Sequence, residues 1–193
     1  MYAFITGSVD EKNPAYVVIN VQGVGYLIHI SLNTFSAIGN QTEIKLFTHL
    51  AVREDAHLLY GFYTRSEKEL FLQLITVSGV GANTARMILS SLSVSEAIDA
   101  IAGGKANILQ SVKGIGAKTA QRIVIDLRDK VGKGHETTEI SGISYNTIKD
   151  EALSALLVLG FNKPAAEKAL EKLMRADPEI VVEKLIKEAL KML

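Results

Sequence analysis

Apolar and polar positions alternate in short runs over the first third of the chain, and turn-forming residues separate these runs. Alternation predicts strands, because successive side chains of a strand point to opposite faces. Five strands are expected, over residues 2–9, 15–21, 26–30, 41–50 and 52–60. Strands this short and this closely spaced suit a small closed barrel, so residues 1–64 are predicted to form an OB-fold β-barrel.

From residue 65 onward, apolar positions recur at the three- and four-residue spacing of amphipathic helices. An all-α domain is therefore expected over residues 65–131. Ser66, with Glu69 three positions later, predicts a capping box at the start of its first helix. Ser93 predicts the start of a later helix, and the segment between 31 and 40 is expected to be a polar connection between strands.

The last third of the chain divides into a polar stretch and a helical one. Residues 132–146 are rich in Gly, Thr, Ser and Glu and lack periodicity, so they predict a flexible linker. Residues 147–193 predict a three-helix bundle, with Asp177 as the N-cap of its last helix. The expected fold class is multidomain α+β: an OB-fold barrel, a central all-α domain and a C-terminal three-helix bundle.

One short stretch of the central domain occurs twice. Residues 77–89 align with residues 112–124 at an offset of 35, and seven of the thirteen positions are identical. Each copy holds Gly-hydrophobic-Gly between two helical runs. Paired glycines break a helix and allow tight turns, so each copy predicts a helix, a hairpin and a second helix. The hydrophobic residue between the glycines is expected to point inward.

The second helix of each copy begins directly after the glycines. Its first backbone N–H groups lack intrahelical acceptors and carry partial positive charge, which suits a phosphate. The two copies resemble the helix-hairpin-helix family, which grips the DNA backbone without reading bases. The predicted DNA-binding residues are Ser78, Gly79, Val80, Gly81, Asn83 and Arg86 in the first copy, and Lys113, Gly114, Ile115, Gly116, Lys118 and Arg122 in the second.

The repeat allows two other interpretations. Lys118-Thr119 suggests a nucleotide-binding phosphate loop, but Ala117 and Val112 stand where that motif requires glycine. The two copies could also be helical hairpins that simply pack together, which leaves the glycines and the cations around them without a reason.

The composition limits which cellular compartment and which kind of binding partner can be expected. The 193 residues carry no cysteine, which excludes disulfides and thiolate metal sites and fits a reducing interior. No signal pattern opens the chain and no run approaches 18 apolar residues, so a cytoplasmic protein without membrane contact is expected. The net charge is zero, yet residues 66–131 carry a net charge of +2. The small positive excess coincides with the repeat.

Glu54 and Asp55 form an acidic pair near the last predicted strands. From the residues alone a solvated turn is the favoured interpretation.

The C-terminal bundle has no cluster of polar residues that could form a catalytic or ligand site, and a tethered bundle of this kind usually binds a protein partner. Its candidate partner-binding residues are Leu153, Leu156, Leu157, Leu159, Phe161, Leu170, Leu173 and Leu185.

The order of barrel, two hairpins, linker and bundle resembles the RuvA family of bacterial Holliday-junction-binding proteins. Residues 1–7, 23–26, 52–55 and 59–62 carry the resemblance together with the two hairpins. It implies a homotetramer, or an octamer, that holds a four-way DNA junction. It also implies that the acidic pair is a central pin that repels phosphates. A RuvB-type hexameric ATPase, recruited by residues 147–193, and a junction resolvase are the implied protein partners.

No catalytic residue, metal ligand or cofactor is expected in this chain. The main alternative is a structure-specific nuclease or glycosylase that uses the hairpins for positioning, although Asp126 and Asp129 fit a solvated helix face better than a catalytic pair. A further alternative is a single-strand-binding adaptor whose barrel is the binding surface.

Overall fold

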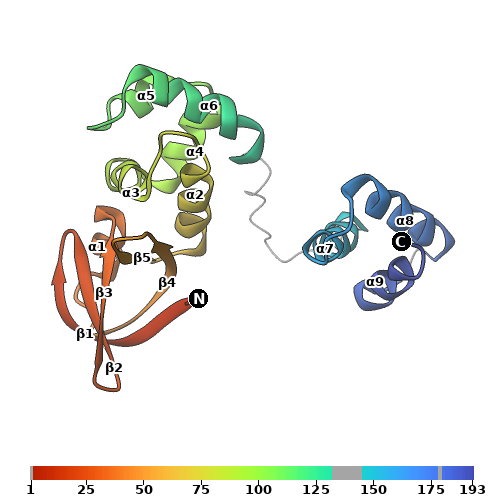
Figure 1. The fold of residues 1–193 in the computed structure, drawn as a ribbon, viewed down its shortest axis with the longest axis horizontal. Coiled ribbons are helices and arrows are strands. Elements are labelled where there is room, and N and C mark those ends of the chain that lie inside the picture. Colours follow the sequence, from red (N-terminus) through yellow and green to blue (C-terminus); the bar gives the residue numbers. More distant parts are fainter. Residues whose placement is uncertain (1, 132–144, 178–179) are drawn as a thin grey trace. The chain divides into compact units, whose positions relative to one another are not determined.

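The computed structural model describes residues 2–131, 145–177 and 180–193, and it divides into two compact units, Met1–Glu136 and Thr137–Leu193 (Figure 1). The first unit contains a closed barrel and the helices of both hairpins, and the second contains a helical bundle. This architecture confirms the predicted fold class. The predicted linker lies outside the described residues up to position 144, and the first helix of the bundle begins at Tyr145.

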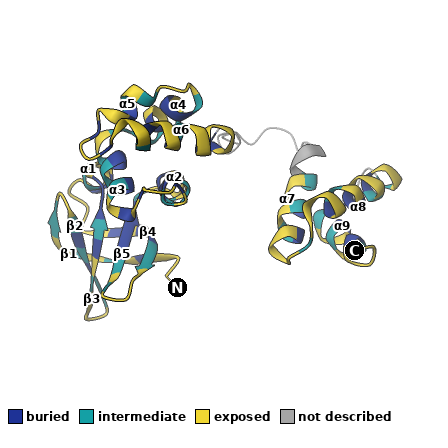
Figure 2. Cartoon of the chain, turned by 45° about the horizontal axis from the view of Figure 1, so that its top comes forward, coloured by how far each residue is buried: buried dark blue, intermediate teal, exposed yellow. Residues whose placement is uncertain are grey.

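The barrel is closed by five strands in the order β1-β2-β3-β5-β4. All neighbours pair antiparallel except β3 and β5, which are parallel. Alternate side chains fill the interior, so the inner faces of the strands are buried (Figure 2). The strands are β1 Phe4–Asn13, β2 Tyr16–Val21, β3 Val24–Ile30, β4 Glu43–Val52 and β5 His57–Phe62.

A short helix, α1 (Leu32–Ile38), replaces the polar connection expected between β3 and β4. Ser31 caps it, because the Ser31 hydroxyl accepts a hydrogen bond from the Thr34 N–H at 3.0 Å. Only Thr34 and Ile38 of this helix are buried. Seven residues with two inward positions give too little periodicity to predict a helix from sequence.

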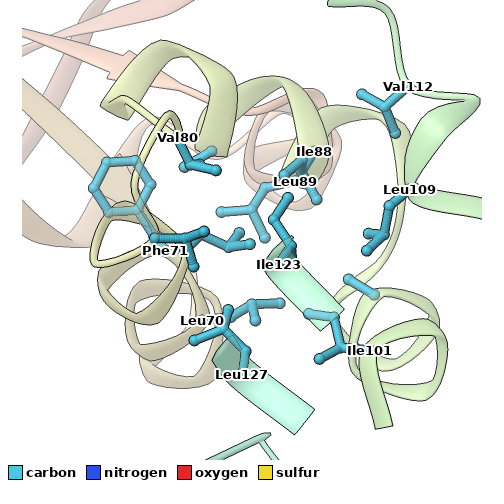
Figure 3. Close-up of a cluster of buried hydrophobic side chains, with 14 of the residues drawn as sticks. Leu70, Phe71, Val80, Ile88, Leu89, Ile101, Leu109, Val112, Ile123 and Leu127 are labelled. Carbon is cyan, nitrogen blue, oxygen red and sulfur yellow. The ribbon is translucent and has the colours of Figure 1, made fainter. Parts of the chain in front are cut away.

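Five helices follow the barrel and share one core (Figure 3). Leu70, Phe71, Ile88, Leu89 and Ile123 are all at most 2% exposed within it. The helix start predicted at Ser93 is confirmed, since Ser93 is the N-cap of α4 and forms a capping box with Glu96. The helices are α2 Arg65–Ile75, α3 Ala82–Ser91, α4 Val94–Ala102, α5 Ala106–Gln110 and α6 Ala117–Val131.

The predicted capping box at the start of α2 is wrong. Thr64, not Ser66, is the N-cap, and its hydroxyl accepts from the Glu67 N–H at 3.1 Å. Glu67 does not complete a capping box, because its carboxylate is buried and turned toward the barrel. It accepts hydrogen bonds from the Thr34 hydroxyl at 2.6 Å, from the Tyr63 N–H at 3.2 Å and from the Ser31 hydroxyl.

Replacement of Glu67 by alanine is expected to lower the free energy of unfolding by roughly 2–4 kcal/mol, because the buried hydroxyls of Ser31 and Thr34 lose their shared acceptor. Urea denaturation of both proteins measures the difference. Glu69→Ala is the matched control, since Glu69 is exposed on the same helix and should change stability by less than about 0.5 kcal/mol. Equal effects of the two substitutions would contradict a structural role for the Glu67 carboxylate.

The second unit is a bundle of α7 Tyr145–Val158, α8 Lys163–Ala176 and α9 Val182–Leu190. Asp177 is the C-cap of α8, so its predicted role as N-cap of the last helix is wrong; Val181 precedes α9. The Asp177 carboxylate instead pairs with Lys184 of α9 at 3.2 Å. In the described parts of both units, no helix is long and apolar enough to cross a membrane.

Candidate nucleic-acid interface

The two hairpins have nearly identical backbones. The first glycine of each adopts a positive φ, +88° at Gly79 and +89° at Gly114, a region that L side chains rarely occupy. The next residue donates its N–H back across the turn, from Val80 to Val77 at 3.0 Å and from Ile115 to Val112 at 3.1 Å. The repeat in sequence is therefore a repeat in structure.

Each hairpin is fixed from below by the hydrophobic residue between its glycines. Val80 is 4% exposed and Ile115 is 5% exposed, and both belong to the core of the helical region. Figure 3 shows Val80 within this core. The prediction that these side chains point inward is confirmed. Their backbone groups can still face a ligand, but their side chains cannot touch one.

The second glycine of each hairpin stands in open space. Nothing lies within 4 Å of the position that a Cβ would take at Gly81 or Gly116, and neither residue has a positive φ. The fold itself therefore has room for a side chain at both positions. Gly81 is the N-cap of α3 and provides no side-chain hydrogen bond, so the first N–H groups of that helix stay available. A closely approaching phosphate explains glycine here better than internal packing does.

A groove of ≈ 470 Å³ joins the two hairpins. The Arg122 guanidinium crosses it and donates to the Ser78 carbonyl at 3.4 Å, so the second unit of the repeat contacts the first. The groove is lined by Ser78 and Gly79 of the first hairpin and by Lys118, Thr119, Gln121, Arg122, Ile125 and Asp126 of α6. An anion in this groove would meet donors from the first hairpin and from α6 of the second repeat, with the Asp126 carboxylate at the groove as well.

Lys113, Lys118 and Arg122 are exposed around the second hairpin, as the sequence predicts. Within the residues that the structure covers, none of these three side chains forms an ion pair. Their charges are therefore available to an anionic ligand. The first hairpin has Asn83 where the second has Lys118, and Asn83 is also exposed.

Arg86 is not placed as predicted. Its guanidinium is turned away from the hairpin and toward the barrel, where it donates to the carbonyls of Ala15 at 3.3 Å and Ile30 at 3.2 Å. Nη2 donates to the Asn83 side-chain oxygen at 3.3 Å and Nε is buried, so the guanidinium is directed into the protein and not toward a ligand at the hairpin. Burial lowers the pKa of neighbouring His29, and the Arg86 charge lowers this pKa further. Arg86 therefore belongs to the contact between barrel and hairpin, and we remove it from the candidate DNA ligands.

Glu54 and Asp55 lie in the turn between β4 and β5, and both are exposed. The Arg53 N–H closes this turn by donating to the Ala56 carbonyl at 2.9 Å. Neither carboxylate has a salt-bridge partner among the described residues. The turn thus presents two adjacent negative charges to solvent.

The predicted partner-binding residues of the bundle separate into two groups. Leu156, Leu170 and Leu185 are 0% exposed, so their predicted contact with a partner is wrong and they form the core instead. Leu153, Phe161 and Leu173 are half-buried beside that core. Leu157 and Leu159, at 40% and 59%, are the members of the predicted set whose side chains reach solvent.

Sequence reasoning missed several residues of these surfaces. Thr119, Gln121 and Ile125 line the groove, and Val158 is 88% exposed between two exposed leucines. The spacing of Lys118, Arg122 and Ile125 along α6 holds a usable signal, because residues three and four apart share a helix face. No such signal distinguishes Val158 from a core residue.

A small barrel joined to two glycine-turned helical hairpins defines the class of tandem helix-hairpin-helix proteins. Comparison with known proteins agrees, since residues 71–129 match the family described as a SAM-like helix-hairpin-helix tandem. The flanking regions also match: residues 1–61 match the RuvA N-terminal domain, and residues 147–193 match the RuvA C-terminal domain.

Several known proteins match this chain over its whole length. The chain is 53% identical to the Holliday junction branch migration complex subunit RuvA of Christiangramia forsetii over 193 residues, which cover all of both proteins. It is 51% identical to the same subunit of Flavobacterium psychrophilum, with 99% of each covered, and 46% identical to that of Bacteroides fragilis, with 100% of each covered. The chain belongs to the RuvA family.

Proposed function

We propose that this chain binds four-way DNA junctions through its two hairpins and serves as the non-catalytic DNA-binding subunit of a branch migration complex. The observation that carries the proposal is the pair of hairpins with the same turn geometry, each with a glycine in open space at the start of a helix. The relatives that it matches over their whole length are named as Holliday junction branch migration complex subunits. Backbone donors and a few cations would hold DNA by shape and not by sequence.

The small positive charge around the hairpins of a single chain supports an assembly of several chains on one DNA molecule. Three available cations and two hairpins per chain would hold a single duplex loosely, whereas several copies acting together would multiply the affinity. We propose that four copies surround one junction, so that each arm meets two hairpins. Eight copies would cover both faces of the junction, while four would leave one face open to a junction resolvase.

We further propose that residues 147–193 recruit a RuvB-type hexameric ATPase, which supplies the energy for moving the junction. The exposed apolar residues Leu157, Val158 and Leu159 at the end of α7 support this role, since exposed apolar clusters commonly mark protein contacts. The described residues contain no group of three or more His, Asp or Glu side chains placed to hold a metal ion. The nuclease alternative therefore has no observation in its favour.

Native mass spectrometry with and without a synthetic four-way junction tests the central proposal. Four or eight copies bound to one junction are expected, with a linear duplex and a single-stranded oligonucleotide competing poorly. Preferred binding of the single strand would favour the adaptor alternative. Cutting of the junction by the protein and magnesium alone would favour the nuclease.

Neutralising the acidic turn by Glu54→Gln with Asp55→Asn is expected to raise affinity for linear duplex by roughly tenfold. Two carboxylates near phosphates repel them, and their loss removes that repulsion in every copy. Titration of a fluorescent duplex measures the change, and the rate of motor-driven branch migration should change with it. Glu11→Gln with Asp10→Asn, an acidic pair on β1, is the matched control. If the two double variants bind duplex equally, the turn is only a solvated loop.

A further inference from the structure

The two copies of the repeat carry their arginine at different positions. In the alignment of the copies Arg86 corresponds to Gln121, whereas Arg122 corresponds to Met87. One residue along an α-helix is a rotation of about 100°. The arginine of the first copy therefore leaves its helix in a different direction from that of the second. Arg122 reaches into the groove between the hairpins, and Arg86 reaches the barrel.

Asn83 also holds the Arg86 side chain in this orientation. The Asn83 side-chain oxygen accepts from Nη2 of Arg86 at 3.3 Å, while Nη1 donates to the barrel carbonyls. Asn83 stands where the second copy has Lys118. A lysine offers only donors and could not accept this hydrogen bond. The first hairpin therefore differs from the second at a residue that supports the contact between Arg86 and the barrel.

Other polar contacts join α3 to the barrel region, in addition to the apolar core in which Tyr60 and Phe62 of β5 pack against Phe71 of α2. The Asn33 side-chain amide of α1 donates to the carbonyls of Leu89 at 2.7 Å and Leu92 at 2.8 Å, at the end of α3. The Leu32 N–H donates to the Ser90 hydroxyl at 3.2 Å. Arg86, the fifth residue of α3, therefore ties the middle of the helix to the barrel, and α1 ties its last turn. We refer to Asn33, Asn83, Arg86 and Ser90 as the anchor.

We propose that the anchor fixes the angle between the first hairpin and the acidic turn of the barrel, and that Arg86 is a positioning residue for junction selectivity. The proposal rests on the proposed function, because it concerns how attraction at the hairpin and repulsion at the turn act on one DNA molecule. A rigid angle lets a junction satisfy the hairpin while its centre meets the turn. With a loosened angle, a straight duplex can reach the hairpin and avoid the acidic side chains.

The test compares Arg86→Gln, Asn33→Ala and Arg122→Gln with the unchanged protein. Affinities for a synthetic four-way junction and for a linear duplex of the same arm sequence are measured over a range of salt concentrations. Arg122→Gln should reduce the slope of log affinity against log salt by about one for each lost phosphate contact. Arg86→Gln should leave the duplex slope unchanged. Both anchor variants should lower the junction-to-duplex affinity ratio by about tenfold.

Asn33→Ala separates positioning from charge, because it removes no cation and acts on α3 through the carbonyls of Leu89 and Leu92, not through the Arg86 side chain. Thermal unfolding of each variant establishes that it is folded. A fall in the duplex slope for Arg86→Gln equal to that of Arg122→Gln would overturn the proposal, since Arg86 would then contact phosphate. Unchanged affinity ratios in both anchor variants would overturn it as well. Absence of junction preference in the unchanged protein would refute the proposed function, and the slopes would still decide whether Arg86 is an anchor or a ligand.

Discussion

Valine at both Gly81 and Gly116 is expected to lower affinity for a four-way junction by at least about 100-fold, because two hairpins in every copy lose close contact with phosphate. The structure has open space for the new side chains, so the loss comes from the approaching ligand and not from the fold. Stability should fall by no more than about 1 kcal/mol, mainly because valine is a poorer N-cap than glycine. Electrophoretic titration and thermal unfolding measure the two effects.

The choice of glycine matters for this experiment. Gly114 has a φ of +89°, so valine there would strain the turn and confuse lost binding with lost folding. Gln110→Val is the matched control, since Gln110 is uncharged, exposed and four residues before the hairpin. Gly81→Ala with Gly116→Ala should give a smaller loss than valine does. Unchanged junction affinity in the valine variant would refute the assignment of the hairpins as the DNA-binding elements.

The hairpins could be predicted from sequence because their determinants are local. Two glycines two residues apart fix the turn, and the residue between them, Val80 or Ile115, must turn inward to be buried. The number of barrel strands could be predicted for the same reason, since alternation is a property of neighbouring residues. Two bounds were wrong, because β1 continues to Asn13 and β5 begins only at His57, after the acidic turn. Helix α1 was missed because its stabilising contacts come from α3 and from Glu67, which are far away in the sequence.

The candidate site was less predictable than the fold. A long side chain such as Arg86 can reach in several directions, and the acceptors that decide among them, Ala15 and Ile30, lie 71 and 56 residues away. The same limit applies to the bundle. Leu156 and Leu159 are both leucines near the end of one helical pattern, yet the first is 0% and the second 59% exposed. Tertiary packing sets that difference, and periodicity alone cannot.

Aspartate at Val158 and Leu159 is expected to abolish ATPase-driven branch migration while leaving junction binding unchanged. Both side chains are exposed, so the bundle core of Leu156, Leu170 and Leu185 stays intact and the substitution should cost the fold little. An apolar contact with the ATPase would instead bury two unpaired charges, at a cost of several kcal/mol in each copy. Branch migration is measured as the conversion of a labelled junction into separated duplexes by this protein together with the ATPase.

The control is Ala165→Asp, which places one carboxylate at an exposed position in the first turn of α8, where a carboxylate is favourable. Migration should proceed normally with this variant. Removal of residues 147–193 should give the same result as the double aspartate: full junction binding and no migration. If the truncated chain still supports migration, the bundle does not recruit the motor. If truncation stops migration and the double aspartate does not, the bundle recruits it through a surface other than the end of α7.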